Sequence, residues 1–546
     1  MADILQSGFN ALSIPFAFLY AEIHYRFFPF FPSLLFKKEP EVICDIPHRL
    51  DPGMDLIIML LLNDLRRFPT EPIEVAATIS QPGRGTTLFT FNNLIDHEIE
   101  HPFKKNQRIF LLPIRRNELP AGEIFVNVKV TLQSVRKTWV VLNDNIPGTS
   151  KRAFRTYVSS KPLPGNELCK TGDMHVHSQY SQSHVEFGPP LQVIDAMASA
   201  CGLDFVAVTD HSYDLSCAMG DYLREDQELE RWKIFQKEIT KPEAFQTKLI
   251  AGEEVTCLNA SGKSVHLCTL GGKTFIPGSM DGARRHLCFP QSLTVSQVCN
   301  EIHNQGGIAI AAHPGSRSGL LQRILLHRGR WTVRDAMSDL DGFQALNSGF
   351  MKAWGRGIAL WLRVLQQGTR LPLVGGNDAH GDFSKYRAIK APFVSVYEND
   401  ERHFGGGRTG IYGNPSSQND LLDAVRQGAT FVTTGPYISV NYSEEPDSYA
   451  VSCKGTNTAA ETMHIHAIST PEFGNLQTIR VLAGSTRSER EERVIANISA
   501  REDPFEIIIP VDVSSLASGS YLRAEAVTTG GSGEGCQAFT SAVYLN

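Results

Sequence analysis

Short runs of alternating apolar and polar residues, separated by turn-forming residues, dominate residues 41–165. Clear examples are 74–80, 87–91 and 124–132. A period of two places every second side chain on the same face of a strand, so the pattern predicts a β-rich domain. The stretch 54–67 is more continuously apolar, and we expect one helix there.

The pattern changes over residues 166–440, where strand-like runs alternate with runs of helical period. Strands are expected at 204–210, 248–254, 307–313 and 371–376, with weaker ones at 265–270 and 341–346. Helices are expected at 190–201, 221–239, 294–305, 353–367 and 419–427. Such alternation is typical of an α/β layer or barrel. Residues 441–546 return to the strand pattern, which predicts a C-terminal β-sandwich.

Residues 1–40 form an apolar and aromatic N-terminal arm. The apolar run 9–21 is shorter than the roughly 20 residues that a spanning helix needs, so no transmembrane segment is expected. Residues 26–38 combine aromatic side chains, prolines and lysines. We favour an arm that packs on its own chain or on a second subunit, because prolines interrupt an amphipathic helix. A peripheral membrane contact through 26–38 is the alternative.

The composition of the 546 residues is that of a multidomain globular protein, with 42% hydrophobic and 20% charged residues. The net charge of −6 gives no strong signal for nucleic-acid binding, which normally needs a basic surface. The ten cysteines contain no CxxC pair, which favours reduced thiols and a cytoplasmic location.

Residues that can bind metal ions gather at the ends of the expected strands. His175 and His177 are two positions apart, so a strand would direct both imidazoles to one face. Further candidates follow along the chain: His211, Glu254, His266, His313, Asp378 and His380. Because the carboxyl ends of parallel strands meet at one edge of a sheet, these side chains are expected to converge. Imidazole and carboxylate ligands without cysteine suit Zn²⁺, Mn²⁺ or Fe²⁺.

The order HxH, TDH, GxE, H, AHP and DxH resembles the PHP (polymerase and histidinol phosphatase) superfamily. Within it, residues 172–178, 201–212, 376–381 and 429–436 are similar to the metallohydrolases grouped with carbaryl hydrolase. The resemblance covers about half of the chain and implies a distorted (β/α)7 barrel over 166–440. The expected fold class is therefore multidomain α/β plus β, with this barrel between an N-terminal β-rich domain and a C-terminal β-sandwich.

The resemblance also implies two or three divalent ions. The first would be held by His175, His177, Glu254 and Asp378. Glu254 would bridge to a second ion, which His266 and His313 complete, and His211 and His380 would hold a third. Glu254 is preferred to Glu253 because the family's bridging carboxylate stands two residues after a glycine, here Gly252. Many members carry an aspartate near Gln182, and we expect His184 to replace it.

A cluster of divalent ions lowers the pKa of bound water toward about 7 and neutralises charge on substrate oxygens. The leading hypothesis is thus a phosphoesterase that acts on a small phosphomonoester or phosphodiester through a metal-bound hydroxide. A carboxylic-ester, carbamate or amide hydrolase is the alternative that the carbaryl hydrolase resemblance suggests. A non-catalytic metal-binding module is the third hypothesis.

Four further residues are candidates for substrate binding or for orienting the metal ligands. Asp210 would orient a ligand or shuttle a proton, or else cap a turn. Arg317 and Arg387 would clamp an anion, or else lie on the surface. Asn347 would contact substrate or cap a turn. The expected partner is a small ester or phosphoester, and the flanking domains would restrict access to the site or form a homo-oligomer.

Overall fold

The computed structural model describes residues 39–545 apart from 146–150, 182–187, 220, 242–244, 279–292, 318–322, 324–326, 338, 348–351, 391–394, 400–402, 446–447, 451–460, 487–491, 500–503 and 531–534. The expected arm, including 26–38, lies almost wholly outside the described residues, and so does His184. Among the helices that are described, none is both long and apolar enough to cross a membrane.

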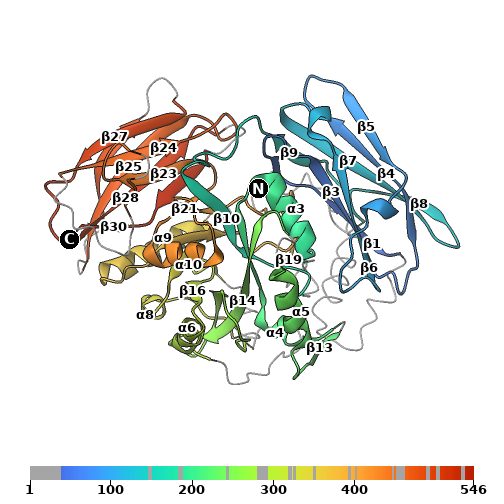
Figure 1. The fold of residues 1–546 in the computed structure, drawn as a ribbon, viewed down its shortest axis with the longest axis horizontal. Coiled ribbons are helices and arrows are strands. Elements are labelled where there is room, and N and C mark those ends of the chain that lie inside the picture. The colour runs from blue at the N-terminus through green and yellow to red at the C-terminus, as the bar shows by residue number, and fades with distance from the viewer. Residues whose placement is uncertain are drawn as a thin grey trace.

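Residues 41–158 form two β-sheets that share one apolar core (blue in Figure 1). One sheet has the order β1-β3-β6, and the other has the order β2-β9-β7-β4-β5 with β8 beside β7. The strands are β1 (Glu41–Asp45), β2 (Arg49–Leu50), β3 (Leu56–Asn63), β4 (Glu71–Ser80), β5 (Thr86–Phe91), β6 (Gln107–Ile114), β7 (Gly122–Gln133), β8 (Thr138–Leu142) and β9 (Phe154–Val158). Two short 3₁₀ turns, η1 (Ile95–His97) and η2 (Arg116–Glu118), lie between them.

The helix expected at 54–67 is wrong, because β3 occupies this stretch as the middle strand between β1 and β6. A continuous apolar run suits a strand that is buried on both faces as well as it suits a buried helix. Periodicity alone therefore cannot distinguish the two.

A third, much larger sheet spans the centre and the C-terminal part of the chain. Its strand order is β18-β17-β16-β15-β14-β11-β10-β21-β22-β29-β28-β25-β26, with β30 beside β28. The central strands are β10 (Cys169–Val176), β11 (Phe205–His211), β14 (Lys248–Leu258), β15 (Ser264–Leu270), β16 (Ile308–Ala311), β17 (Gly342–Asn347), β18 (Leu373–Gly376), β21 (Arg408–Tyr412) and β22 (Thr430–Thr433). The C-terminal ones are β25 (Leu476–Ser485), β26 (Arg493–Ser499), β28 (Ser520–Thr528), β29 (Gln537–Thr540) and β30 (Val543–Tyr544).

The expected (β/α)7 barrel is wrong, because this sheet is large and mixed. β14 and β15 follow one another without a helix and pair antiparallel, and β16 also runs antiparallel to β15. β10 pairs antiparallel with β21, whereas β10, β11 and β14 are parallel. Strand content exceeds helix content over the described residues.

The C-terminal β-sandwich expected over 441–546 is not separate from the central sheet, since β22 pairs with β29 and joins the C-terminal strands to it. A three-stranded sheet, β23-β24-β27, shares an apolar core with that extension (red in Figure 1). Its strands are β23 (Tyr437–Asn441), β24 (Thr462–Ile468) and β27 (Glu506–Asp512). Two short hairpins, β12 (Cys217–Ala218) with β13 (Asp221–Glu225) and β19 (Tyr386–Lys390) with β20 (Ser395–Asn399), complete the described strands.

The described helices lie around the central strands. They are α3 (Leu191–Cys201), α4 (Ser212–Leu215), α5 (Glu230–Ile239), α6 (Val295–Asn304), α8 (Val333–Ala336), α9 (Lys352–Gln366) and α10 (Gln418–Gln427). Four of them begin and end within two residues of the positions predicted from periodicity. The helix expected at 221–239 is wrong in its first half, where β13 lies.

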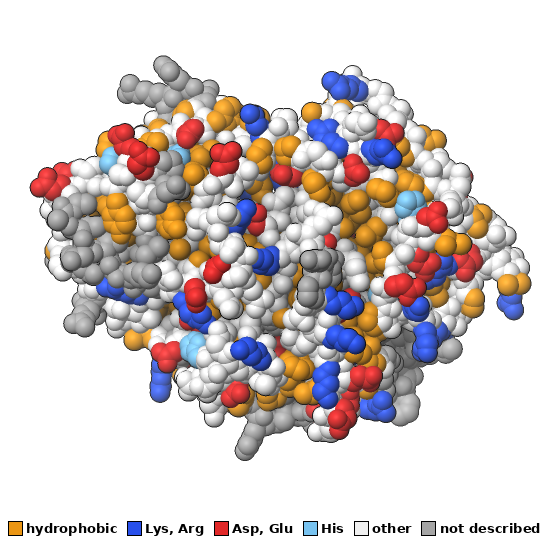
Figure 2. Space-filling model, viewed as in Figure 1, with side chains coloured by type: hydrophobic (Ala, Val, Ile, Leu, Met, Phe, Trp, Pro, Cys, Tyr) orange, Lys and Arg blue, Asp and Glu red, His pale blue; other side chains and the backbone are white. Residues whose placement is uncertain are grey.

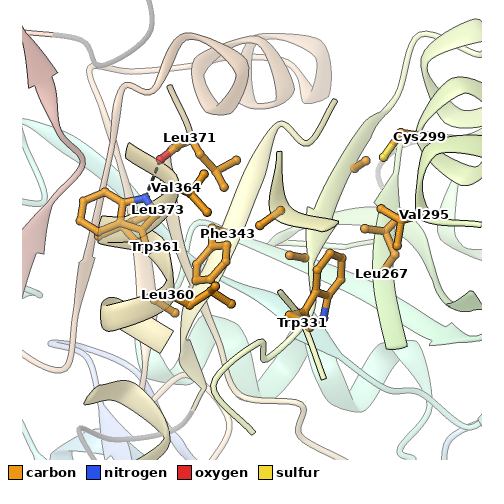
Figure 3. Close-up of a cluster of buried hydrophobic side chains, with 14 of the residues drawn as sticks. Leu267, Val295, Cys299, Trp331, Phe343, Leu360, Trp361, Val364, Leu371 and Leu373 are labelled. Atoms are coloured by element: carbon orange, nitrogen blue, oxygen red, sulfur yellow. Dashed lines mark hydrogen bonds between the residues drawn. The ribbon is translucent and has the colours of Figure 1, made fainter. Parts of the chain in front are cut away.

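One apolar cluster supports the strands β15 to β18 (Figure 3). Trp361 of α9 is fully buried there, and its Nε1 donates a hydrogen bond to the carbonyl of Leu371 at 2.7 Å. Phe343 of β17 and Trp331 belong to the same cluster. On the outside, acidic and basic side chains are interspersed on the face that Figure 2 shows.

A buried arginine joins the N-terminal sheets to the rest of the molecule. The Arg49 guanidinium donates to both carboxylate oxygens of Glu472, at 2.9 and 3.1 Å, and to Asp51 at 2.9 Å. It also donates to the carbonyl of Cys201 at the end of α3. Arg49 and Glu472 are 1% and 7% exposed, so this ion pair is shielded from water.

Replacing Arg49 with methionine is expected to lower the free energy of unfolding by about 3–5 kcal/mol, because it leaves the Glu472 carboxylate buried without its partner. Urea unfolding followed by circular dichroism measures the loss. The control is Lys104→Met, which removes an exposed pair with Glu100 and should cost no more than about 1 kcal/mol. Equal losses in the two variants would contradict the prediction.

Candidate metal centre

The paired histidines at the end of β10 lie at the bottom of the site. His175 and His177 are fully buried, and their Nε2 atoms are 3.2 Å apart. The Nδ1 atom of His175 lies 2.9 Å from Oε1 of Gln344, and Nδ1 of His177 lies 3.1 Å from the hydroxyl of Ser181. When each Nδ1 carries the proton toward its oxygen partner, both Nε2 lone pairs face the same point.

The Glu254 carboxylate is the centre of the cluster. Its Oε2 lies 2.8 Å from Nδ1 of His211, and 3.6 and 3.4 Å from Nε2 of His175 and His177. Its Oε1 contacts Nδ1 of His266 and lies 3.0 Å from Nε2 of His313. Each oxygen of one carboxylate therefore faces its own set of imidazoles, as a bridging ligand would.

The strand register explains why these residues meet. His211 of β11 is directly opposite Glu254 of β14 in a parallel pair. The amide of Ala312 donates to the carbonyl of His266 at 3.2 Å, which brings the residue after it, His313, beside β15.

The segment after β18 is hydrogen-bonded alongside the end of β10. The amide of Asp378 donates to the carbonyl of His175 at 2.8 Å, and the amide of His177 donates to the carbonyl of Ala379 at 2.9 Å. The Asp378 carboxylate then lies 3.1 Å from Nε2 of His177. His380 stacks on the ring of His177, with the two centroids 4.0 Å apart.

Three overlapping groups in this cluster could hold a metal ion. Within each group, one ligand atom from every member lies within 4.8 Å of the others. The groups are His175, His177, Glu254 and Asp378; then Glu254, His266 and His313; and then His177, His211 and His380. All eight residues that the sequence predicts as ligands within the described part are thus brought together.

The electrostatics of the cluster differ from one imidazole to the next. Burial lowers the pKa of His177, and the neighbouring rings of His380 and His211 lower it further. For Glu254, burial opposes the charged form, but His266, His211 and His175 outweigh it and hold the pKa well below its usual range. Glu254 and His177 are therefore in the state in which each binds a metal, whereas at His211 the Glu254 carboxylate outweighs burial and raises the pKa to about 9.

The donor set fits a divalent transition metal. Two imidazole nitrogens at 3.2 Å can share at most one proton, so a cation between them removes the lone-pair repulsion. The three groups offer only nitrogen and carboxylate oxygen, and Zn²⁺, Mn²⁺ and Fe²⁺ accept both.

Two residues of the cluster are held in unusual backbone conformations. His313 has φ +32° and Asp378 has φ +54°, in the left-handed region that non-glycine residues rarely occupy. Each costs on the order of 1–3 kcal/mol and persists only where the surroundings impose it. Such strain is concentrated at functional sites.

The neighbouring glutamate lies on the other face of β14, as expected. Glu253 accepts hydrogen bonds from Nε1 of Trp232 at 2.9 Å and from the amide of Ile276 at 3.2 Å. Burial raises its pKa to about 8. Glu253 therefore makes its own contacts away from the imidazoles.

The Asp210 carboxylate turns away from the cluster toward the loop after His177. It accepts from the amide and hydroxyl of Ser178 at 2.7 and 2.5 Å and from the amide of Ser181 at 3.0 Å. Ser181 in turn contacts His177 and accepts from the amide of His211. These contacts match the turn-capping role, with an indirect effect on the orientation of His177.

The other predicted residues differ in where they lie. Arg317 and Asn347 line an open cavity of about 300 Å³ beside the cluster. Arg387 lies in the β19–β20 hairpin, and the position of its side chain is not described. His184 falls in the segment 182–187, outside the described residues, so its role stays a prediction.

Two supporting residues were missed at the level of sequence. The Oε1 atom of Gln344 accepts from Nδ1 of His175 and from the amide of His313, so it orients two ligands at once. Asp173 accepts from the amides of His175 and Asn377 and so ties β10 to the segment of Asp378. The available signal was a polar residue inside a buried strand. Asp173 gave this signal two positions before His175.

No family model and no curated protein matches the chain. Among solved structures, it is similar to a cycloisomaltooligosaccharide glucanotransferase of Paenibacillus sp. in complex with cycloisomaltoheptaose. That match has 10% identity and a TM-score of 0.16 and covers 92% of this chain and 71% of the other. A likeness this low supports no statement about fold or activity.

Glu254→Gln is expected to lower the bound metal by more than about tenfold, because it removes the shared charge and turns an N–H toward the imidazoles. Elemental analysis of the purified, dialysed protein measures the metal per chain. Glu253→Gln is the matched control and should retain wild-type metal content. If Glu253→Gln lost more metal, the choice between the two glutamates would be wrong.

Gln344→Leu is expected to weaken metal binding by about 10–100-fold, because His175 and the His313 amide lose their common acceptor. Gln344→Glu keeps an acceptor oxygen at the same place and should restore binding. Competition with a chromogenic chelator gives the affinity of each variant. Equal affinities for Gln344→Leu and wild type would show that the contact does not orient the ligands.

Proposed function

We propose that the protein is a metal-dependent hydrolase that cleaves a small phosphoester. The observation that carries the proposal is that the cluster opens into the cavity rather than closing on itself. Six of its eight residues line the cavity: His211, Glu254, His266, His313, Asp378 and His380. A structural zinc site closes with four ligands, whereas a catalytic site keeps a position open to substrate.

The ligand groups suit two or three divalent ions of Zn, Mn or Fe. Glu254 and His177 each belong to two groups, so neighbouring ions would share a ligand. Ions held there would supply Lewis acidity and an activated water. The motif resemblance supports this assignment, because the ligand sets it implies for two of the ions coincide with two of the groups. The barrel that it also implies is not found.

The chain's own residues would bind and orient the substrate. Arg317, four residues after His313, lines the cavity and can donate to an anionic group of the substrate in a bidentate manner. Asn347 ends β17 at the cavity, and its Oδ1 is buried without a hydrogen-bond partner among the described residues. An amide at this position can orient the half of the ester that leaves.

Purified protein, loaded with each metal in turn, is to be tested with p-nitrophenyl phosphate, bis-p-nitrophenyl phosphate and a naphthyl carbamate. Release of p-nitrophenol without carbamate turnover is expected. His175→Ala should reduce the rate to that of the buffer, because a ligand of the first group is lost. His303→Ala, which removes a histidine of α6 that pairs with Asp341, is the control and should keep the activity.

Two results would overturn the proposal. Carbamate turnover without phosphoester cleavage would favour the carboxylic-ester, carbamate or amide hydrolase. Stoichiometric metal with no turnover of any of the three compounds would favour a metal-binding module.

A further inference from the structure

Arginines form one side of the cavity beside the metal cluster. Arg317, Arg328 and Arg330 all line it. Arg356 lies close to Arg317 and Arg330, and its Nε donates to the carbonyl of Gly315 at 2.9 Å. Burial lowers the pKa of Arg356, and the charges of Arg317 and Arg330 lower it further, so these cations lie close to one another. We refer to Arg317, Arg328 and Arg330 as the arginine wall.

Part of the wall belongs to the segment 327–331, which lies along the start of β15. The amide of Ser264 donates to the carbonyl of His327 at 3.0 Å, and the amide of Gly329 donates to the carbonyl of Ser264 at 2.7 Å. Ser264 also lines the cavity, and it precedes His266 by two positions, on the same face of the strand. The wall is therefore next to the group formed by Glu254, His266 and His313.

The segment is held firmly. Trp331 is 8% exposed and packs in the cluster of Figure 3, while Asn259 donates to the carbonyl of Arg330 at 2.9 Å. A Cβ added at Gly329 would lie 2.6 Å from the Cβ of Lys263, so the backbone approaches the β14–β15 turn more closely than another residue allows. The arginines thus extend from a fixed backbone.

Arg317 and Arg330 carry charge that no described carboxylate neutralises. Across the part of the chain that the structure describes, no carboxylate lies within ion-pair distance of Arg317, Arg330 or Arg356. The indole Nε1 of Trp331, which also lines the cavity, is buried and has no acceptor among the same residues. Unmatched cations and a free donor together are what an oxyanion would satisfy.

The scissile phosphate does not need this charge. Two divalent ions are neutralised by the carboxylates of Glu254 and Asp378 together with one phosphate dianion, and a third ion would make the site positive without any arginine. The charges of Arg317 and Arg330 then remain for another group. Arginine is suited to it, because its planar fork matches an oxyanion in geometry and stays charged.

We propose that the arginine wall binds a second oxyanion of the substrate, so that the substrate is a phosphoester whose other half carries a carboxylate or a further phosphate. This inference rests on the proposed function and names its substrate class. It adds Arg328 and Arg330 as residues that determine specificity. The arginines repel one another in the free protein. A bound anionic substrate would neutralise this charge at the mouth of the cavity.

The test compares two non-hydrolysable probes, phenylphosphonate and 4-carboxyphenylphosphonate, by calorimetric titration of the metal-loaded protein. The carboxylated probe should bind about tenfold or more tightly, the gain expected for a charged hydrogen bond. In the variant R328Q/R330Q this preference should disappear, while phenylphosphonate binds within about twofold of its wild-type Kd. Arg334→Gln, an exposed arginine of α8 outside the cavity lining, is the control and should keep the preference.

Equal affinities for the two probes in the wild-type protein would overturn the inference, as would a preference that survives in R328Q/R330Q. Turnover of phenyl phosphate and 4-carboxyphenyl phosphate separates this failure from that of the proposed function. Hydrolysis of both esters with equal kcat/KM would overturn the arginine wall alone. Hydrolysis of neither, with the probe preference intact, would overturn the phosphoesterase and support the wall.

Discussion

The Glu254 carboxylate is the interaction on which the central part of the molecule depends. It is 1% exposed and faces imidazoles that come from four places in the chain. A buried carboxylate without partners costs several kcal/mol, so the strands must keep the register that brings those imidazoles to it. A bound metal would satisfy the same requirement more strongly, and its binding energy would then contribute to the stability of the folded sheet.

The residues of the cluster could be predicted from sequence because their signals are local. A pair of histidines at a spacing of two, or a histidine after an apolar run, needs no knowledge of the partner strand. The sheet could not be predicted in the same way. Nothing in the apolar run of β14 shows that it pairs antiparallel with β15 or that it continues past Glu254 to Leu258. Pairing direction is decided by contacts between distant residues, and there the expected alternation of strands and helices led to the wrong architecture.

The residues that sequence reasoning missed all act through tertiary proximity. Gln344 lies on β17, far along the chain from His175, and its role depends on the curvature that brings the two strands together. Arg328 and Arg330 belong to a segment without regular structure, so neither periodicity nor a strand end marked them. What places them at the cavity is the bonding of 327–329 to Ser264, a contact that no spacing in the sequence encodes.

The exposure of the side chains increases from the base of the site to its mouth. This order bears on how a substrate would lie in the site. His175 and His177 are fully buried, His313 is partly accessible, and Arg317 and Arg330 are exposed at the mouth. Metal ions held at the base would attract anions, as the arginines at the mouth do, so charge alone would admit a substrate in either direction. Only the base, however, would combine Lewis acidity with the exclusion of bulk water, where electrostatic interactions are strongest. A substrate with two oxyanions would therefore be cleaved at the one that reaches the cluster, while the arginines hold the other in place and limit its depth of entry.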